Sequence, residues 1–154
     1  TELRDIQREL QHAIQEYFGF RATVINGDTS TSSQSANSRQ KLIDQFQDQP
    51  GFSVIILSTI AVGFGVNVQA ANHVIHFTRC WNPAKEDQAT DRAYRIGQEK
   101  DVYVYYPTVR DAAMPTFEAT LDELLSKRRA LARDMLSGSG EIQASDFERV
   151  LGVC

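Results

Sequence analysis

Apolar positions along the chain follow two different spacings. Between residues 3 and 18 an apolar side chain recurs every three or four positions with charged residues between, which predicts an amphipathic helix. Further helices are predicted at 39–47, 84–95 and 116–136. Short runs rich in β-branched, apolar or aromatic residues predict strands, namely at 22–26, 53–58, 73–77 and 102–106.

The order of these elements predicts the fold class. Strands that alternate with helices are typical of an α/β fold with a parallel sheet and helices on both faces. The continuous apolar run at 53–58 is typical of a strand covered on both sides. Such sheets bind ligands at the carboxyl ends of their strands. Polar clusters follow three of the predicted strands, at 26–30, 58–65 and 79–83.

The composition limits the classes of protein to which this chain can belong. The 154 residues are 42% hydrophobic and 23% charged, which suits one globular domain. The net charge of −4 argues against binding nucleic acid by bulk positive charge, so a nucleic-acid role would need local groups. No apolar run is long enough for a membrane span, and two widely spaced cysteines favour a cytoplasmic location. The histidines show no ligand-like grouping, so no metal site is predicted.

Residues 88–98 (QATDRAYRIGQ) carry the strongest chemical signal. If they continue the predicted helix, Gln88, Arg92 and Arg95 share one face. Two guanidinium groups on one face suit an anion with several oxygens, such as a nucleotide γ-phosphate, whose transfer needs positive charge in the transition state. Spacing alone leaves open a solvated helix whose arginines pair with neighbouring acids, namely Glu86, Asp87 and Asp91.

Three segments resemble one protein family. Residues 88–98 resemble motif VI of the Swi/Snf-type ATPases of helicase superfamily two, and residues 58–67 (STIAVGFGVN) resemble their motif V. Residues 81–83 (WNP) match a tripeptide that this family carries just before motif VI. The resemblance covers roughly residues 20–135 and implies a RecA-like lobe of the P-loop NTPase type. One departure is Val62, where the family usually has the first of two adjacent glycines.

The resemblance implies a set of residues around ATP. Arg95 aligns with the arginine finger of the family, and Arg92 with a second arginine that faces the phosphates. Gln88 aligns with the glutamine that opens motif VI. Gly65 and Asn67 align with positions near the nucleotide at the interface between two lobes.

The resemblance also implies contacts with double-stranded DNA. Gly27 and Thr29 match positions that approach the DNA, and Ser58 and Thr59 align with hydroxyls near its backbone. Such neutral donors can bind phosphates without bulk positive charge. Trp81 aligns with a DNA-facing tryptophan, although packing within the lobe is an equal alternative for this residue.

Two elements of the family's first lobe are absent from this sequence. It contains no G-x-x-x-x-G-K-[ST] phosphate loop and no acidic box of the D-E-x-H type for Mg²⁺. The strand that normally precedes the opening helix is also missing. We therefore expect a portion of a larger, nucleoid-associated protein, whose first RecA-like lobe holds Mg²⁺ and shares ATP with this one.

The sequence also predicts the domain organisation and leaves two other functions open. Residues 1–136 are expected to form the lobe with a trailing brace-type helix at 116–136, and 137–154 a linker and short helix at 145–151. A catalytically silent scaffold lobe and an RNA-directed helicase lobe remain alternatives.

The glycines at 63–65 lack the third glycine of a dinucleotide-binding turn. The loop at 30–38 can be a plain polar connection, and a solvated surface is the favoured interpretation of four basic residues, Lys127, Arg128, Arg129 and Arg133.

Overall fold

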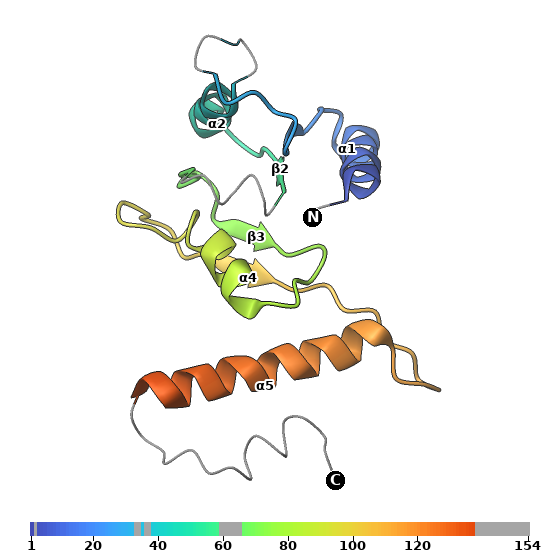
Figure 1. Cartoon of the computed structure of the whole chain (residues 1–154). Helices are drawn as coiled ribbons and strands as arrows, with labels where there is room; N and C mark the ends of the chain where they lie inside the picture. The colour runs from blue at the N-terminus through green and yellow to red at the C-terminus, as the bar shows by residue number, and fades with distance from the viewer. Residues whose placement is uncertain (2, 33–34, 36–37, 59–65, 138–154) are drawn as a thin grey trace, which may run out of the picture. The chain divides into compact units, whose positions relative to one another are not determined.

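The computed structural model describes residues 1, 3–32, 35, 38–58 and 66–137 of the chain, and side chains within these ranges up to residue 134. The described chain forms two compact units, of which the first contains residues 1–80 and 84–107 and the second contains residues 81–83 and the chain from Thr108 onward. The elements, labelled in Figure 1, are α1 Arg4–Phe18, β1 Thr23–Ile25, α2 Arg39–Asp48, β2 Ile55–Leu57, β3 His73–Ile75, α4 Pro83–Thr90, β4 Tyr103–Tyr105 and α5 Phe117–Ser137. The helix predicted at 145–151 lies outside the described residues.

The strands pair in parallel, which confirms the predicted α/β class. Strand β1 pairs with β2, with Thr23 opposite Ile55, and β3 pairs with β4, with His73 opposite Tyr103. The described strands form two separate two-stranded pairs and not one continuous sheet. Each strand is shorter than its predicted run, because only three residues of each run form the ladder.

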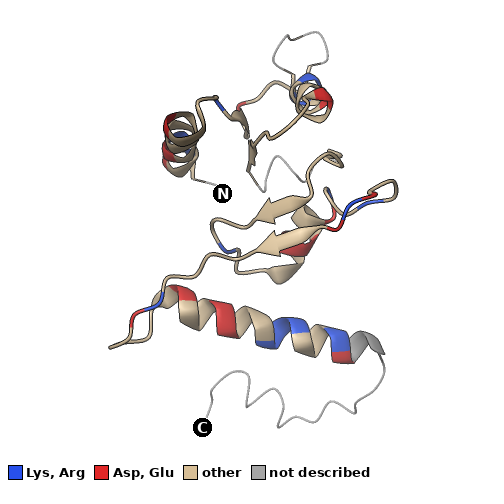
Figure 2. Cartoon of the chain, turned by 180° about the vertical axis from the view of Figure 1, so that it is seen from behind, with Lys and Arg blue, Asp and Glu red and all other residues tan. Residues whose placement is uncertain are grey.

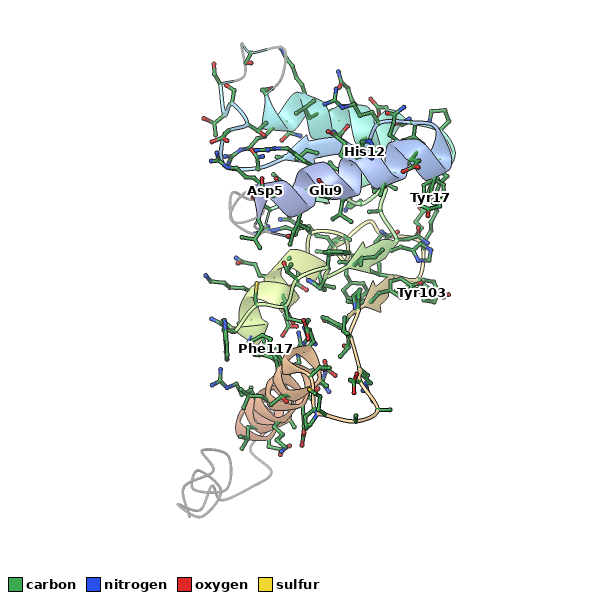
Figure 3. The ribbon with its side chains drawn as sticks, turned by 90° about the vertical axis from the view of Figure 1, so that its right-hand side faces the viewer. Asp5, Glu9, His12, Tyr17, Tyr103 and Phe117 are labelled. Carbon is green, nitrogen blue, oxygen red and sulfur yellow. The ribbon has the colours of Figure 1, made fainter. Side chains whose placement is uncertain are left out.

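The main core of the first unit lies around β1 and β2. Helices α1 and α2 lie on opposite sides of this pair of strands, as expected for a parallel sheet (Figure 1). The core is apolar, and its buried members come from β1, from α2 and from the segment before β3: Ile25, Ile43, Phe46, Val66 and Val68. The amphipathic helix α1 turns its charged face outward, as Figure 3 shows for Asp5, Glu9 and His12, whereas Gln7 is buried.

A buried ion pair joins α4 to the loop after β3. The side chain of Arg79 is 4% exposed and that of Glu86 is fully buried. Arg79 donates from Nε and Nη2 to the two carboxylate oxygens of Glu86, at 3.0 and 3.2 Å. The Cys80 amide donates to Glu86 Oε1 at 2.8 Å. Glu86 therefore pairs with Arg79, and not with the motif VI arginines that its sequence position suggested.

Aromatic rings extend this buried network towards the strands. The Arg79 guanidinium lies 4.4 Å from the centre of the Tyr106 ring, within the range of a cation–π interaction. The His76 ring stacks on Tyr106 at 5.0 Å, and its Nε2 lies 2.9 Å from the Thr90 hydroxyl at the end of α4. Both ends of α4 are thus fixed to residues that follow β3 and β4.

Helix α4 ends at Thr90, so the predicted continuation to residue 95 was wrong. Beyond Thr90 the amides of Arg92 and Ala93 bond three residues back, and the Arg92 carbonyl accepts from the Val68 amide at 2.9 Å. Gly97 then adopts a φ of 99°, which helices of L-residues exclude. Gln88, Arg92 and Arg95 consequently do not share one helical face.

The second unit contains α5 and residues 81–83. The Thr116 hydroxyl oxygen accepts from the Ala119 amide at 3.2 Å and so caps the helix. Acidic residues predominate in the first half of α5 and basic residues in the second, which also contains one acid, Asp134 (Figure 2). At the surface, Lys127 Nζ lies 2.8 Å from Glu123 Oε1, and this hydrogen bond and charge lower the pKa of Glu123. Of the α5 residues, Leu121 and Leu125 are buried.

Replacing Glu86 by alanine should destabilise the protein by about 3–5 kcal/mol, because Arg79 would keep a buried, uncompensated charge. The free energy of unfolding from urea denaturation tests this expectation. The exposed Glu99 provides the matched control, and Glu99→Ala should change the free energy by less than about 0.5 kcal/mol. Equal effects of the two substitutions would contradict the importance of the buried pair.

Replacing Gly97 by alanine should cost more than about 1 kcal/mol of stability, for two reasons. Its φ of 99° strains any L-residue, and an added Cβ would lie 3.0 Å from Gln69 Nε2. Gly27 has no positive φ and no atom within 4 Å of such a Cβ, so Gly27→Ala should be close to neutral. Thermal unfolding of both variants provides the measurement, and a neutral Gly97→Ala would contradict the strained turn.

Candidate functional site

The segment after α4 forms an open hollow that displays the two motif VI arginines. Residues 91–98, here called the arginine loop, surround a space of about 600 Å³, lined by Asp91, Arg92, Tyr94, Arg95, Ile96, Gly97 and Gln98. Arg95 is exposed and Arg92 is half-buried. Gln88 lies exposed on α4 and is not among the lining residues. The structure thus brings together two of the three predicted motif VI residues.

Two buried polar atoms close to this hollow have no hydrogen-bond partner within the described part of the chain. They are Arg92 Nε, a donor, and Asn67 Oδ1, an acceptor. The two residues belong to joined segments, since Val68, which follows Asn67, donates its amide proton to the Arg92 carbonyl. Buried groups of this kind usually find a partner, so their presence fits a ligand that both donates and accepts hydrogen bonds. The other predicted ATP residue, Gly65, lies outside the described residues.

Two glutamines that the sequence interpretation did not single out connect the same segments. Gln98 Nε2 lies 2.8 Å from the Gln69 carbonyl oxygen, and 3.1 Å from the carbonyl oxygens of Ala71 and Ala93. In return, Gln69 Nε2 donates to the Ile96 carbonyl. Gln98 closes the motif VI match, and this position was the one available signal for its role.

The turn after β1 presents two of the residues predicted to approach DNA. Thr29 Oγ1 accepts from the Asn26 amide at 3.0 Å, which leaves its own proton available for donation. Asn26 Oδ1 accepts from the Asp28 amide at 3.0 Å and fixes the tip of the turn. Gly27 is exposed, and no atom lies near the place of a Cβ, so another backbone can approach it closely.

Two buried side chains hold this turn in place. Arg39, at the start of α2, donates from Nε to the Thr29 carbonyl at 3.2 Å, and from Nη2 to the carbonyls of Asn26 and Gly27, each at 3.4 Å. Gln7, which is 1% exposed on α1, accepts from Asn26 Nδ2 at 3.1 Å. Arg39 therefore shapes the turn through backbone carbonyls. Sequence interpretation missed Gln7, because a polar residue within an amphipathic helix gives no sign of burial.

The remaining predicted DNA residues lie in different surroundings. Ser58 is only 3% exposed, and its amide donates to the Ile25 carbonyl at 3.0 Å, just beyond the β1–β2 ladder. Thr59 lies outside the described residues. Trp81 is 60% exposed; its ring meets Phe117 at 5.9 Å, and its carbonyl accepts from Arg128 at 3.1 Å. The tryptophan thus combines a packing contact with a largely open surface.

The described ranges contain no cluster of metal-ligand type and no helix suited to span a membrane. In those ranges no three His, Cys, Asp or Glu side chains gather as they would around a metal ion. The helices found there also include none with both the length and the apolar character of a membrane span.

Comparisons with known proteins agree with this geometry. Residues 3–97 match the family model described as helicase conserved C-terminal domain. The Zorya protein ZorD of Escherichia coli is 76% identical over 151 residues, which are 98% of this chain but 14% of ZorD. The ATP-dependent helicase FUN30 of Saccharomyces cerevisiae is 39% identical over 99 residues, 64% of this chain and 8% of FUN30. The chain therefore spans a small part of the length of these relatives.

Two solved structures share the fold of this chain and part of its sequence. The SWI2/SNF2 ATPase core domain of Sulfolobus solfataricus superposes with a TM-score of 0.63 at 34% identity, over 97% of this chain and 29% of that one. The C-terminal part of the Fun30 ATPase domain gives 0.61 at 27% identity, over 95% and 40%. The chain belongs to the helicase conserved C-terminal domain family and is a RecA-like C-terminal lobe of the Swi/Snf type.

Proposed function

We propose that this chain is the second motor lobe of an ATP-dependent translocase that moves along double-stranded DNA. ATP binds between this lobe and the first RecA-like lobe of the same polypeptide, which holds the Mg²⁺ ion. The observation that carries the proposal is the arginine loop, where Arg95 is exposed and Arg92 has a buried Nε without a partner among the described residues.

The proposed chemistry follows from the charges at this loop. During phosphoryl transfer, negative charge spreads over the oxygens of the transferred group and is stabilised by cations already in place. Arg95, with an exposed side chain, is the arginine finger, and Arg92 donates to a second phosphate oxygen. Asn67 Oδ1 accepts a hydrogen bond from the nucleotide, while Gly65 and Gln88 complete the set of residues near it.

The proposed DNA surface uses neutral groups. Gly27 and the Thr29 hydroxyl, both at a turn that buried side chains fix, approach the phosphate backbone. Thr59 and Trp81 add further contacts in this proposal, whereas the burial of Ser58 favours an indirect role through the backbone at the end of β2. Contacts of this kind are compatible with the net charge of −4.

The proposed motor cycle joins the two sets of residues. ATP draws the lobes together because the arginines reach its phosphates, and hydrolysis releases that attraction. Since the DNA-contacting residues occupy the same lobe, each closure shifts the grip on the duplex relative to the first lobe. Such a cycle moves the protein along the duplex without requiring strand separation.

Replacing Arg95 by alanine in the full-length protein should lower the kcat for ATP by about 10³-fold or more, since it removes positive charge from the transition state. DNA affinity should stay unchanged, because Arg95 belongs to the nucleotide site. The exposed Arg21 serves as the matched control, and Arg21→Ala should retain full turnover. Unchanged ATP hydrolysis in Arg95→Ala would overturn the proposed arginine finger.

Replacing Trp81 by alanine should weaken binding of duplex DNA by about tenfold, as expected for loss of an exposed aromatic anchor. The DNA-independent ATPase rate should remain. Fluorescence anisotropy with a labelled duplex provides the measurement, and Tyr17→Ala, which removes an 82% exposed ring on α1, provides the control. If both variants bind DNA as tightly as the parent, Trp81 is a packing residue only.

A further inference from the structure

We infer that Gln98 and Gln69 form an amide latch, defined by these two side chains, which sets the position of the arginine loop. In this inference Gln98 is a positioning residue for Arg92 and Arg95, and it touches neither ATP nor DNA itself. The inference rests on the proposed function, because it assigns a role in ATP turnover to the contact between the two glutamines and the backbone that carries the two arginines.

The surroundings of Gln98 require a neutral amide. Its Nε2 faces three backbone carbonyl oxygens, from Gln69, Ala71 and Ala93, at 2.8 to 3.1 Å. Its Oε1 accepts from the Lys100 amide at 3.0 Å, which fixes the orientation of the side chain. A carboxylate of the same size keeps the second contact and turns the first into repulsion between oxygens.

The contact is reciprocal. Gln69 Nε2 donates to the Ile96 carbonyl, within the arginine loop, and lies beside Gly97, where an added Cβ would approach it to 3.0 Å. The Val68 amide adds a bond to the Arg92 carbonyl at 2.9 Å. Residues 66–71 and the arginine loop are therefore joined from both sides, by side chains and by the backbone.

The joined segments carry the unpartnered buried atoms of the site. Asn67 Oδ1 lies on one segment and Arg92 Nε on the other. Because the latch joins these segments, a nucleotide that pulls on Arg92 or Arg95 also displaces residues 66–71. Loss of the latch should therefore misplace the arginines most in the transition state, where their placement is most demanding.

The test compares Gln98→Glu with Gln15→Glu in the full-length protein. Gln15 is an exposed glutamine on α1, so its substitution adds the same charge without touching the latch. Gln98→Glu should lower the kcat for ATP by about ten- to a hundredfold while the KM for ATP changes little. Affinity for ADP should be retained, and affinity for ADP with aluminium fluoride should fall in step with kcat. Gln15→Glu should match the parent.

A second variant and a second readout separate positioning from folding. Gln69→Ala removes the Ile96 bond and keeps all bonds of Gln98, so a smaller loss of kcat in the same direction is expected. In both latch variants, hydrogen–deuterium exchange at the Val68 amide should become faster while the protein still unfolds in a single cooperative thermal transition. A fall in ADP and ADP–aluminium fluoride affinity by the same factor, or exchange at Val68 unchanged, would overturn the inference.

The experiments distinguish failure of the latch from failure of the proposed function. If Arg95→Ala abolishes turnover while Gln98→Glu and Gln69→Ala retain it, the arginine finger stands and the latch is refuted. If Arg95→Ala retains turnover, the proposed function is refuted whatever the latch variants do.

Discussion

The buried carboxylate of Glu86 is the constraint on which the candidate site depends. Burying a charged side chain costs free energy unless groups of opposite charge or hydrogen-bond donors compensate it. For Glu86 these groups are the Arg79 guanidinium and the Cys80 amide. The same guanidinium lies over Tyr106, which in turn stacks on His76 beside the end of α4. Helix α4 is thereby held against the residues after β3 and β4. The arginine loop starts where that helix stops, so the buried pair fixes the point at which the loop begins.

From this fixed helix the chain builds a site with few charges. Among the described residues, the cations that line the hollow are Arg92 and Arg95, and the turn after β1 presents a glycine and a hydroxyl. Polar side chains support both features: the half-buried Gln98 donates to backbone carbonyls beside the loop, and the buried Arg39 donates to carbonyl oxygens of the turn. In the proposed function, this arrangement lets an acidic lobe bind phosphate-bearing ligands through a few exposed groups, whose positions are fixed by other side chains.

The sequence predicted the elements well and the contacts less well. Helix and strand positions follow from spacing, which is a local property, and α1, α2 and the four strands match to within about two residues at each end. Local spacing did not reveal the end of α4 at Thr90, beyond which the Arg92 carbonyl accepts from the distant Val68 amide. Glu86 resembled a surface acid and Gln7 a polar surface residue, since burial of a polar side chain leaves no mark in the pattern. The hydrogen bonds of the half-buried Gln98 to distant carbonyls could not be read from local spacing either. Motif resemblance pointed to Arg92 and Arg95 as candidates for ATP turnover, which stays a prediction, and it gave no sign of the contacts that support them.

The most direct test of the central claim is the ATPase rate of the full-length protein, measured with duplex DNA, with RNA of equal length, and without nucleic acid. The account predicts strong stimulation by duplex DNA, weaker stimulation by RNA, and no hydrolysis by the 154-residue chain on its own. A rate that no nucleic acid changes would contradict a translocase and favour a scaffold role for the lobe. Stronger stimulation by RNA would instead contradict the assignment to duplex DNA.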